Sequence, residues 1–289
     1  MTDDGGTIEV ESLVPSRLGT QAYWDDNYGR ELSNFCEAGD EGEVWFGEAS
    51  SDEILDWIAR YLPSPMTPTK LSFSTGTDED GQLPGPLGNG RTDSQILDDR
   101  EYETNPSLFL KRNSRPVGCG NGQLLFLLAQ GGYSGGYSVD CLTGVDYSAS
   151  SIELTSQIAR AKGIQGLRLE VRDVLRDTIE PPHRTRISGS KGWDLITDKG
   201  TFDAICLSEE TIDGKKLEAI YPEKIFDLLV KPGGIFLITS CNWTEEELIQ
   251  KFVSPNIGFK FHSKIPRACF SFGGSKGSTI TTIAFQTCS

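Results

Sequence analysis

The sequence predicts an α/β fold in which a mostly parallel sheet of seven strands is covered by helices on both faces. Three observations predict it. The length of 289 residues and the hydrophobic content of 37% suit one large domain with its own core. From residue 108 onward, short apolar runs alternate with segments of helical periodicity, which is typical of parallel strands joined by helices. The last two apolar runs have only a glycine-rich loop between them, so the final strand can pair antiparallel.

Composition divides the chain into four segments. Residues 1–12 are polar and acidic, and we expect a disordered leader there. Residues 13–62 carry two helical patterns and are predicted to form an N-terminal helical cap. Residues 63–107 are rich in proline, glycine and acidic residues without periodicity, which predicts a low-complexity insertion. Residues 108–289 hold the alternating pattern and form the predicted core.

The helical cap begins with an aromatic stripe. Tyr23, Trp24 and Tyr28 fall on neighbouring positions of a predicted helix, for which Thr20 is a suitable N-cap. The stripe either closes over a binding site or packs in the core. A second predicted helix, over residues 51–62, has one apolar face.

The core elements follow in chain order. Helices are predicted over residues 122–130, 148–162, 218–229 and 244–252. Ser148 is a candidate cap of the second, which Gly163 follows, and the last has a capping-box pattern at Thr244 and Glu247. Strands are predicted over residues 141–146, 167–171, 193–197, 235–239, 259–262 and 280–285. Residues 178–192 read as a polar insertion, and a turn with no room for a helix is expected after Asp198.

The first strand of the sheet is predicted to be disrupted. Residues 111–117 are polar and contain Pro116, and a proline cannot donate a hydrogen bond within a central strand. Residues 108–110 offer a shifted strand instead. An unusual splice junction is the other explanation.

The charge of the chain excludes several classes of partner. The net charge is −15, which disfavours binding to nucleic acid or to an anionic membrane. Residues 1–104 hold 23 acidic and 6 basic residues, whereas residues 105–289 hold 19 acidic and 21 basic ones. The acidity therefore belongs to the N-terminal third, which is either a solvated leader or a surface for a basic partner.

The cysteines point to a reducing compartment. The seven cysteines are scattered, no two form a Cys-x-x-Cys pair, and the chain has only two histidines. No metal site is therefore expected. No apolar run is long enough for a membrane span, and the acidic N-terminus is unlike a secretory signal. We expect a monomer in the cytoplasm, with the nucleus as a second compartment.

A glycine-rich turn opens the first core helix. Gly118, Gly120, Asn121 and Gly122 would let a cofactor approach the backbone and the free N–H groups of the helix start. Gln123 stands where a dinucleotide fingerprint needs its third glycine, which disfavours a nicotinamide or flavin enzyme.

Acidic residues end the following strands. Asp146, followed by Tyr147, can accept both hydroxyls of a ribose or can cap the next helix. Asp173 can accept from an adenine amine while Val174 packs on the ring. With Asp198 at the fourth strand, this ordered set predicts an S-adenosylmethionine pocket at the carboxyl edge of a Rossmann-like sheet.

These features resemble a known family, the seven-strand lysine methyltransferases that act on translation elongation factor 1A. The motifs that carry the resemblance are Leu18–Asp25, Val44–Phe46, Gly118–Gly122, Gly144–Ser148, Asp198–Ile205, Leu237–Thr244 and Phe270–Gly274. The resemblance implies that the chain methylates a lysine of the elongation factor with S-adenosylmethionine. It also implies that the glycine turn, Asp146 and Asp173 contact the cofactor, with Tyr23 and Trp24 close by.

The same resemblance places Asp198 beside the transferred methyl group, as the catalytic residue. A carboxylate is too weak a base to deprotonate lysine, so Asp198 would orient the amine by accepting a hydrogen bond. The predicted substrate side is formed by Lys199, Thr201, Phe202, Asn242 and Trp243. Trp243 either stacks on the substrate lysine or walls the pocket. Asp203 either braces its loop or touches the substrate.

Two other readings stay open. A methyltransferase of the same fold could act on another protein or on a small molecule. A non-catalytic binding protein would result if the first strand had decayed and the cofactor site with it.

Overall fold

The computed structural model describes residues 11–62, 114–130, 139–180, 192–229, 231–267, 270–272, 275–277 and 280–288. Most of the predicted leader, the whole insertion over residues 63–107 and most of the insertion over residues 178–192 lie outside these residues. Residues 108–110, which could have served as a shifted first strand, lie outside them as well.

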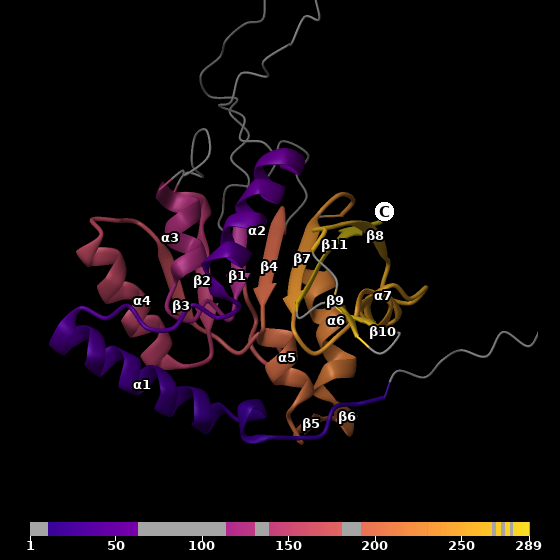
Figure 1. The fold of residues 1–289 in the computed structure, drawn as a ribbon, viewed down its shortest axis with the longest axis horizontal. Coiled ribbons are helices and arrows are strands. Elements are labelled where there is room, and N and C mark those ends of the chain that lie inside the picture. The colour runs from indigo at the N-terminus through magenta and orange to yellow at the C-terminus, as the bar shows by residue number, and fades with distance from the viewer. Residues whose placement is uncertain are drawn as a thin grey trace, which may run out of the picture.

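A seven-stranded sheet forms the centre of the fold, in the order β3-β2-β1-β4-β7-β11-β8 (Figure 1). The strands are β1 (Ser114–Val117), β2 (Thr143–Asp146), β3 (Arg168–Val171), β4 (Leu195–Lys199), β7 (Ile235–Ser240), β8 (Phe259–Lys264) and β11 (Thr281–Thr287). The five strands from β3 to β7 pair in parallel, and β11 is antiparallel to both β7 and β8. The predicted Rossmann-like fold and its antiparallel last strand are confirmed.

The prediction of a disrupted first strand is wrong. β1 forms in the middle of the sheet, and its residues 114–117 align in register with residues 195–198 of β4. Its pairing with β2 is reduced to Val117 opposite Val145. Pro116 has no N–H to offer to a neighbour, and a four-residue strand held mainly on one side accommodates that loss.

The helices form two layers. They are α1 (Gln21–Ala38), α2 (Gly47–Tyr61), α3 (Gln123–Gln130), α4 (Ala149–Ala161), α5 (Thr201–Cys206), α6 (Leu217–Leu228) and α7 (Glu245–Phe252). Helices α1 to α4 share one hydrophobic core with the sheet, and α5 to α7 share the other. None of the described helices combines the length and the apolar character needed to cross a bilayer.

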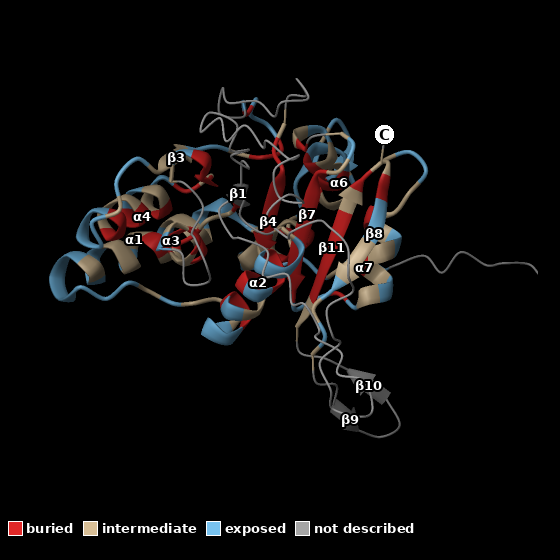
Figure 2. Cartoon of the chain, turned by 90° about the horizontal axis from the view of Figure 1, so that it is seen from above, coloured by how far each residue is buried: buried red, intermediate tan, exposed pale blue. Residues whose placement is uncertain are grey.

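Alternation along the central strands divides the side chains between these cores. Leu195 and Leu237 pack with α1 to α4, whereas their neighbours Ile196 and Ile238 pack with α5 to α7. Figure 2 shows the buried strands between the two partly exposed helical layers. A sheet that is covered on both faces leaves its carboxyl edge as the place for a ligand.

Side chains at the helix starts confirm three predicted caps. The Thr20 side chain accepts from the Tyr23 backbone N–H, and Ser148 does the same for Ser151. Thr244 and Glu247 form the complete capping box of α7. Helix α2 begins four residues before the predicted start.

The structure contains three short elements that differ from the prediction or were not predicted, two of them between β4 and α6 and one between β8 and β11. A helix, α5, follows Gly200 directly, where a turn without a helix was expected. Two short hairpins were also not predicted: β5 (Thr211–Ile212) with β6 (Lys215–Lys216), and β9 (Phe270–Phe272) with β10 (Ser275–Gly277). Gly200 adopts a φ of +93°, which lets the chain turn from strand into helix within one residue.

Candidate functional site

A cavity of about 530 Å³ lies at the carboxyl ends of the parallel strands. The sheet order reverses between β1 and β4, and this point is where open α/β sheets bind their ligands. The cavity wall contains Gly118 after β1, Asp146 at the end of β2, Asp173 after β3 and Lys199 at the end of β4. The sheet therefore brings together residues that lie up to 81 positions apart in the sequence.

The glycine turn is shaped by its backbone. Gly118, Gly120 and Gly122 all have positive φ angles, of +62°, +57° and +82°. A Cβ atom at Gly118 would collide with the Thr201 hydroxyl, and one at Gly120 would lie 2.7 Å from the Tyr28 hydroxyl. Of the turn residues, Gly118 lines the cavity. The Asn121 side chain instead donates to the carbonyl oxygens of Glu41 and Glu43, so it fastens the turn to the chain after α1.

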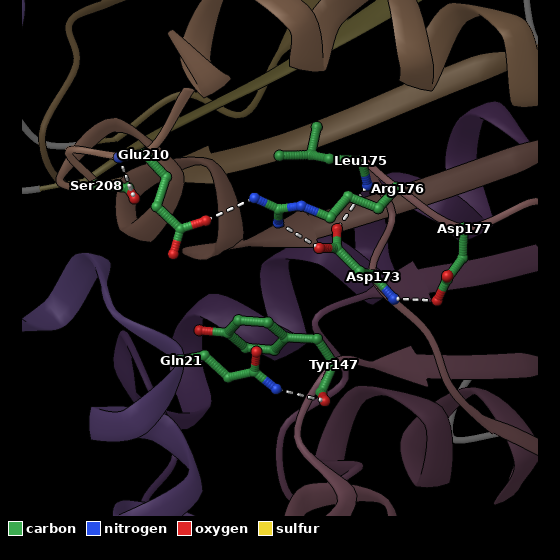
Figure 3. Close-up of polar contacts among 8 residues, drawn as sticks. All are labelled: Gln21, Tyr147, Asp173, Leu175, Arg176, Asp177, Ser208 and Glu210. Carbon is green, nitrogen blue, oxygen red and sulfur yellow. Dashed lines mark hydrogen bonds and ion pairs between the residues drawn. The ribbon is translucent and has the colours of Figure 1, made fainter. Parts of the chain in front are cut away.

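Asp146 connects the glycine turn to the next helix. Its carboxylate accepts from the Gly120 N–H at 3.1 Å and from the Ser148 N–H at 3.0 Å. Burial raises its pKa, and these two hydrogen bonds act in the opposite direction. Asp146 and Tyr147 both line the cavity, and the Tyr147 carbonyl accepts from the Gln21 side chain of α1 (Figure 3).

An ion pair spans the cavity wall beyond β3. The Arg176 guanidinium donates to Asp173 at 2.6 Å and to Glu210 at 2.5 Å, as Figure 3 shows. These bonds raise the pKa of Arg176. Asp173 also accepts from the Leu175 N–H, and Val174 lines the cavity beside it. Arg176 and Glu210 were not predicted, because the sequence separates them by 34 positions and no motif links them.

Aromatic side chains of the helical cap close one side. Trp24, Tyr28 and Trp45 line the cavity, and the Trp24 ring lies 5.2 Å from Trp45 and 6.0 Å from Tyr28 between centroids. The Trp24 indole N–H donates to the Leu18 carbonyl, which fixes its orientation. Tyr23 packs edge-on against Trp24 and is not part of the cavity wall. The aromatic stripe thus serves both readings: it packs in the core and closes over the site.

The opposite side of the cavity lies at the ends of β4 and β7. Three residues of the predicted substrate side, Lys199, Thr201 and Asn242, line the cavity here, together with Asp203 and Cys241. The Thr201 hydroxyl donates to the Val117 carbonyl at 3.0 Å. The Asp203 carboxylate accepts from the Ser240 hydroxyl and from the Cys241 N–H, so it holds the loop after β7. Burial raises the pKa of Asp203.

Asp198, at the end of β4, does not line the cavity. Its side chain is 1% exposed, and its carboxylate accepts from the N–H groups of Thr201 and Phe202 and from the Tyr221 hydroxyl at 2.5 Å. Burial raises its pKa to about 7. In this structure the Asp198 carboxylate is therefore occupied by three protein donors and does not face the cavity. The structure thus places Asp198 as the residue that starts α5.

Two residues of the predicted substrate side belong to the core. Phe202 is 0% exposed and Trp243 is 4% exposed, and both pack with α6 and α7 rather than against the cavity. Lys251 lies over the Trp243 ring, 4.1 Å from its centroid. Neither residue lies where the expected substrate contact would need it, because α5 turns Phe202 inward and the loop after β7 buries Trp243.

The described residues offer no metal centre: no group of three or more His, Cys, Asp and Glu side chains is arranged to hold an ion. They fit S-adenosylmethionine on three counts. The left-handed glycine turn leaves the backbone open at Gly118, Asp146 lines the cavity where a ribose would bind, and Val174 lines it beside Asp173, where an adenine ring would pack.

Comparison with known proteins agrees with this fit. A profile of the family described as Methyltransferase domain matches residues 116–267. Protein-lysine N-methyltransferase efm4 of Schizosaccharomyces pombe is 38% identical over 278 residues, which are 96% of this chain and 97% of the relative. EEF1A lysine methyltransferase 2 of Homo sapiens is 33% identical over 283 residues, 98% of this chain and 92% of the relative.

A more distant relative extends the same pattern. Protein-lysine N-methyltransferase EFM4 of Saccharomyces cerevisiae is 30% identical over 276 residues, which are 94% of this chain and 96% of the relative. Similarity at this level covers the helical cap as well as the sheet, so it concerns the whole architecture. The chain belongs to this family of S-adenosylmethionine-dependent protein-lysine N-methyltransferases.

Proposed function

We propose that this protein methylates a lysine of translation elongation factor 1A. The observation that carries the proposal is the similarity over nearly the full length of both chains to enzymes named for that substrate. The cavity supports it, since its volume of about 530 Å³ can hold a cofactor and residues at the end of β4 and after β7, such as Lys199 and Asn242, line it.

S-adenosylmethionine, when bound, supplies an electrophilic methyl group on a sulfonium. The chain has to hold that group and an incoming amine in line, and such alignment is worth roughly 7–11 kcal/mol at best. Asp146 would hold the ribose, and the aromatic wall of Trp24, Tyr28 and Trp45 would exclude water from one side. Positioning is therefore the main contribution of the protein.

The amine has to arrive without its proton. A free lysine has a pKa of about 10.4, and a site with apolar walls lowers it because burial disfavours the charged form. Asn242, after β7, and Asp203, in α5, both line the cavity and carry oxygen atoms with lone pairs that can accept from the neutral amine, although Asp203 also accepts from Ser240 and Cys241. With Asp198 sealed from the cavity, these two residues take over the orienting role in our proposal.

Transfer of a labelled methyl group tests the identity of the substrate. The purified enzyme, incubated with a cell lysate and S-adenosylmethionine labelled on its methyl group, is expected to label one protein of the size of elongation factor 1A. An Asp146→Asn variant is the control, since it should lose the cofactor and with it the label. Labelling of a different protein, or of small molecules alone, would contradict the proposed substrate and leave the fold class untouched.

The assembly and location belong to the same proposal. We propose a monomer that acts in the cytoplasm and also in the nucleus; the scattered cysteines support a reducing compartment. Size-exclusion chromatography with light scattering checks the first part, and microscopy of a tagged protein checks the second.

A further inference from the structure

One cation in the cavity wall has no counter-ion in the described part of the protein. Three basic side chains of that part line the cavity: Arg172, Arg176 and Lys199. Arg176 is paired with two carboxylates, and Arg172 lies 3.7 Å from the carboxylate of Glu170. Lys199 contacts only neutral oxygen atoms, namely the Trp45 carbonyl at 2.7 Å and the Ser51 hydroxyl at 3.4 Å.

This arrangement leaves one hydrogen-bond donor of Lys199 unused. An ammonium group has three N–H donors, and the protein accepts two of them. A partly buried cation without an anion costs free energy, and a negative group from a ligand would offset that cost. The position therefore suits an anionic part of the bound cofactor.

The sheet determines which part of the cofactor can reach Lys199. Asp146, the predicted ribose ligand, ends β2, whereas Lys199 ends β4, and β1 with Gly118 lies between them. Arg172 follows β3, on the far side of Asp146. A cofactor with its ribose at Asp146 and its adenine toward β3 therefore extends its methionine part across β1 toward β4. The single carboxylate of S-adenosylmethionine belongs to that methionine part.

We propose that Lys199 binds the α-carboxylate of S-adenosylmethionine through its Nζ atom. The same ammonium would then join the cofactor to the Trp45 carbonyl, and so tie the aromatic wall to the loaded site. The proposal rests on the use of this cofactor and not on the identity of the protein substrate.

Two ligands separate this role from a purely structural one. S-adenosylhomocysteine carries the α-carboxylate, whereas 5′-methylthioadenosine keeps adenine and ribose and lacks the amino-acid part. Titration calorimetry on the full chain is expected to show that Lys199→Met lowers the affinity for S-adenosylhomocysteine about 10- to 100-fold. A loss of this size is usual when a hydrogen bond to a charged group is removed. The affinity for 5′-methylthioadenosine should stay within about two-fold.

Matched variants complete the experiment. Lys224→Met removes the same charge from the exposed side of α6, outside the cavity, and should leave both affinities unchanged. Lys199→Arg keeps a cation and should retain most of the preference for S-adenosylhomocysteine. Should Lys199→Met fail to fold, as judged by circular dichroism, Lys199→Gln serves in its place.

An equal loss for both ligands would overturn the proposal, because it would mean that Lys199 only holds the Trp45 segment. An unchanged affinity for S-adenosylhomocysteine would overturn it as well. If the unsubstituted protein bound neither ligand, the cofactor itself would be in error, which is a distinguishable failure.

Discussion

Asp198 shows how burial changes the meaning of a single residue. Its three donors, Thr201 N–H, Phe202 N–H and the Tyr221 hydroxyl, would lose their acceptor in Asp198→Ala. Buried donors without partners cost about 1–3 kcal/mol each, so we expect unfolding by urea to report a loss of about 2–4 kcal/mol. Tyr221→Phe removes one donor and should cost about 1 kcal/mol. An Asp198→Ala variant with unchanged stability and no methyl transfer would restore the catalytic reading.

In the absence of ligand, Lys199 should make the stability of the folded protein depend on pH. Burial lowers its pKa from 10.5 to about 8 in the folded protein, so the unfolded chain binds the proton more tightly. The contribution of Lys199 to the free energy of unfolding is therefore lowest below about pH 8, and it rises as the pH increases toward 10.5. The difference in unfolding free energy between the unsubstituted protein and Lys199→Met should shift by about 1–3 kcal/mol over this range. A flat difference would show that the lysine is not desolvated.

At the scale of elements, the turn between β1 and α3 depends on both backbone and space. Gly118 and Gly163 have similar positive φ angles, +62° and +70°, but only Gly118 would place a Cβ against a neighbour, the Thr201 hydroxyl. Gly163→Ala should cost about 1 kcal/mol through strain alone. Gly118→Ala should lower the free energy of unfolding by about 2–4 kcal/mol and weaken the binding of S-adenosylhomocysteine. Thermal unfolding and calorimetry measure both, and equal costs would refute the close packing.

Elements with a local signal could be predicted from the sequence, and elements without one could not. The caps Thr20, Ser148 and Thr244 act within one helical turn, so their sequence pattern is sufficient. β1 was misjudged because its stability comes from β4, which lies far away in the chain. Helix α5 has only six residues, and it forms because the distant Tyr221 and the buried Asp198 hold its first turn.

The site residues at the ends of the strands could be predicted from the sequence, whereas the contacts made by the helices that cover the sheet could not. Asp146, Asp173 and Lys199 could be placed because the carboxyl ends of parallel strands meet at one edge. The link of Arg176 to Glu210, and the turn of Phe202 and Trp243 away from the cavity, depend on how helices pack on the sheet. No periodicity or spacing reports that packing.

The whole molecule combines a cofactor cavity with a helical cap whose Trp24 and Trp45 form one of its walls. The central claim is that this cavity serves to methylate a lysine of translation elongation factor 1A. The most direct measurement is a peptide mass spectrum of the purified factor after incubation with S-adenosylmethionine, with the enzyme and without it. Methyl groups are expected on a lysine of the factor only when the enzyme is present, and none with Asp146→Asn. An unmodified factor, together with an enzyme that binds S-adenosylhomocysteine, would contradict it.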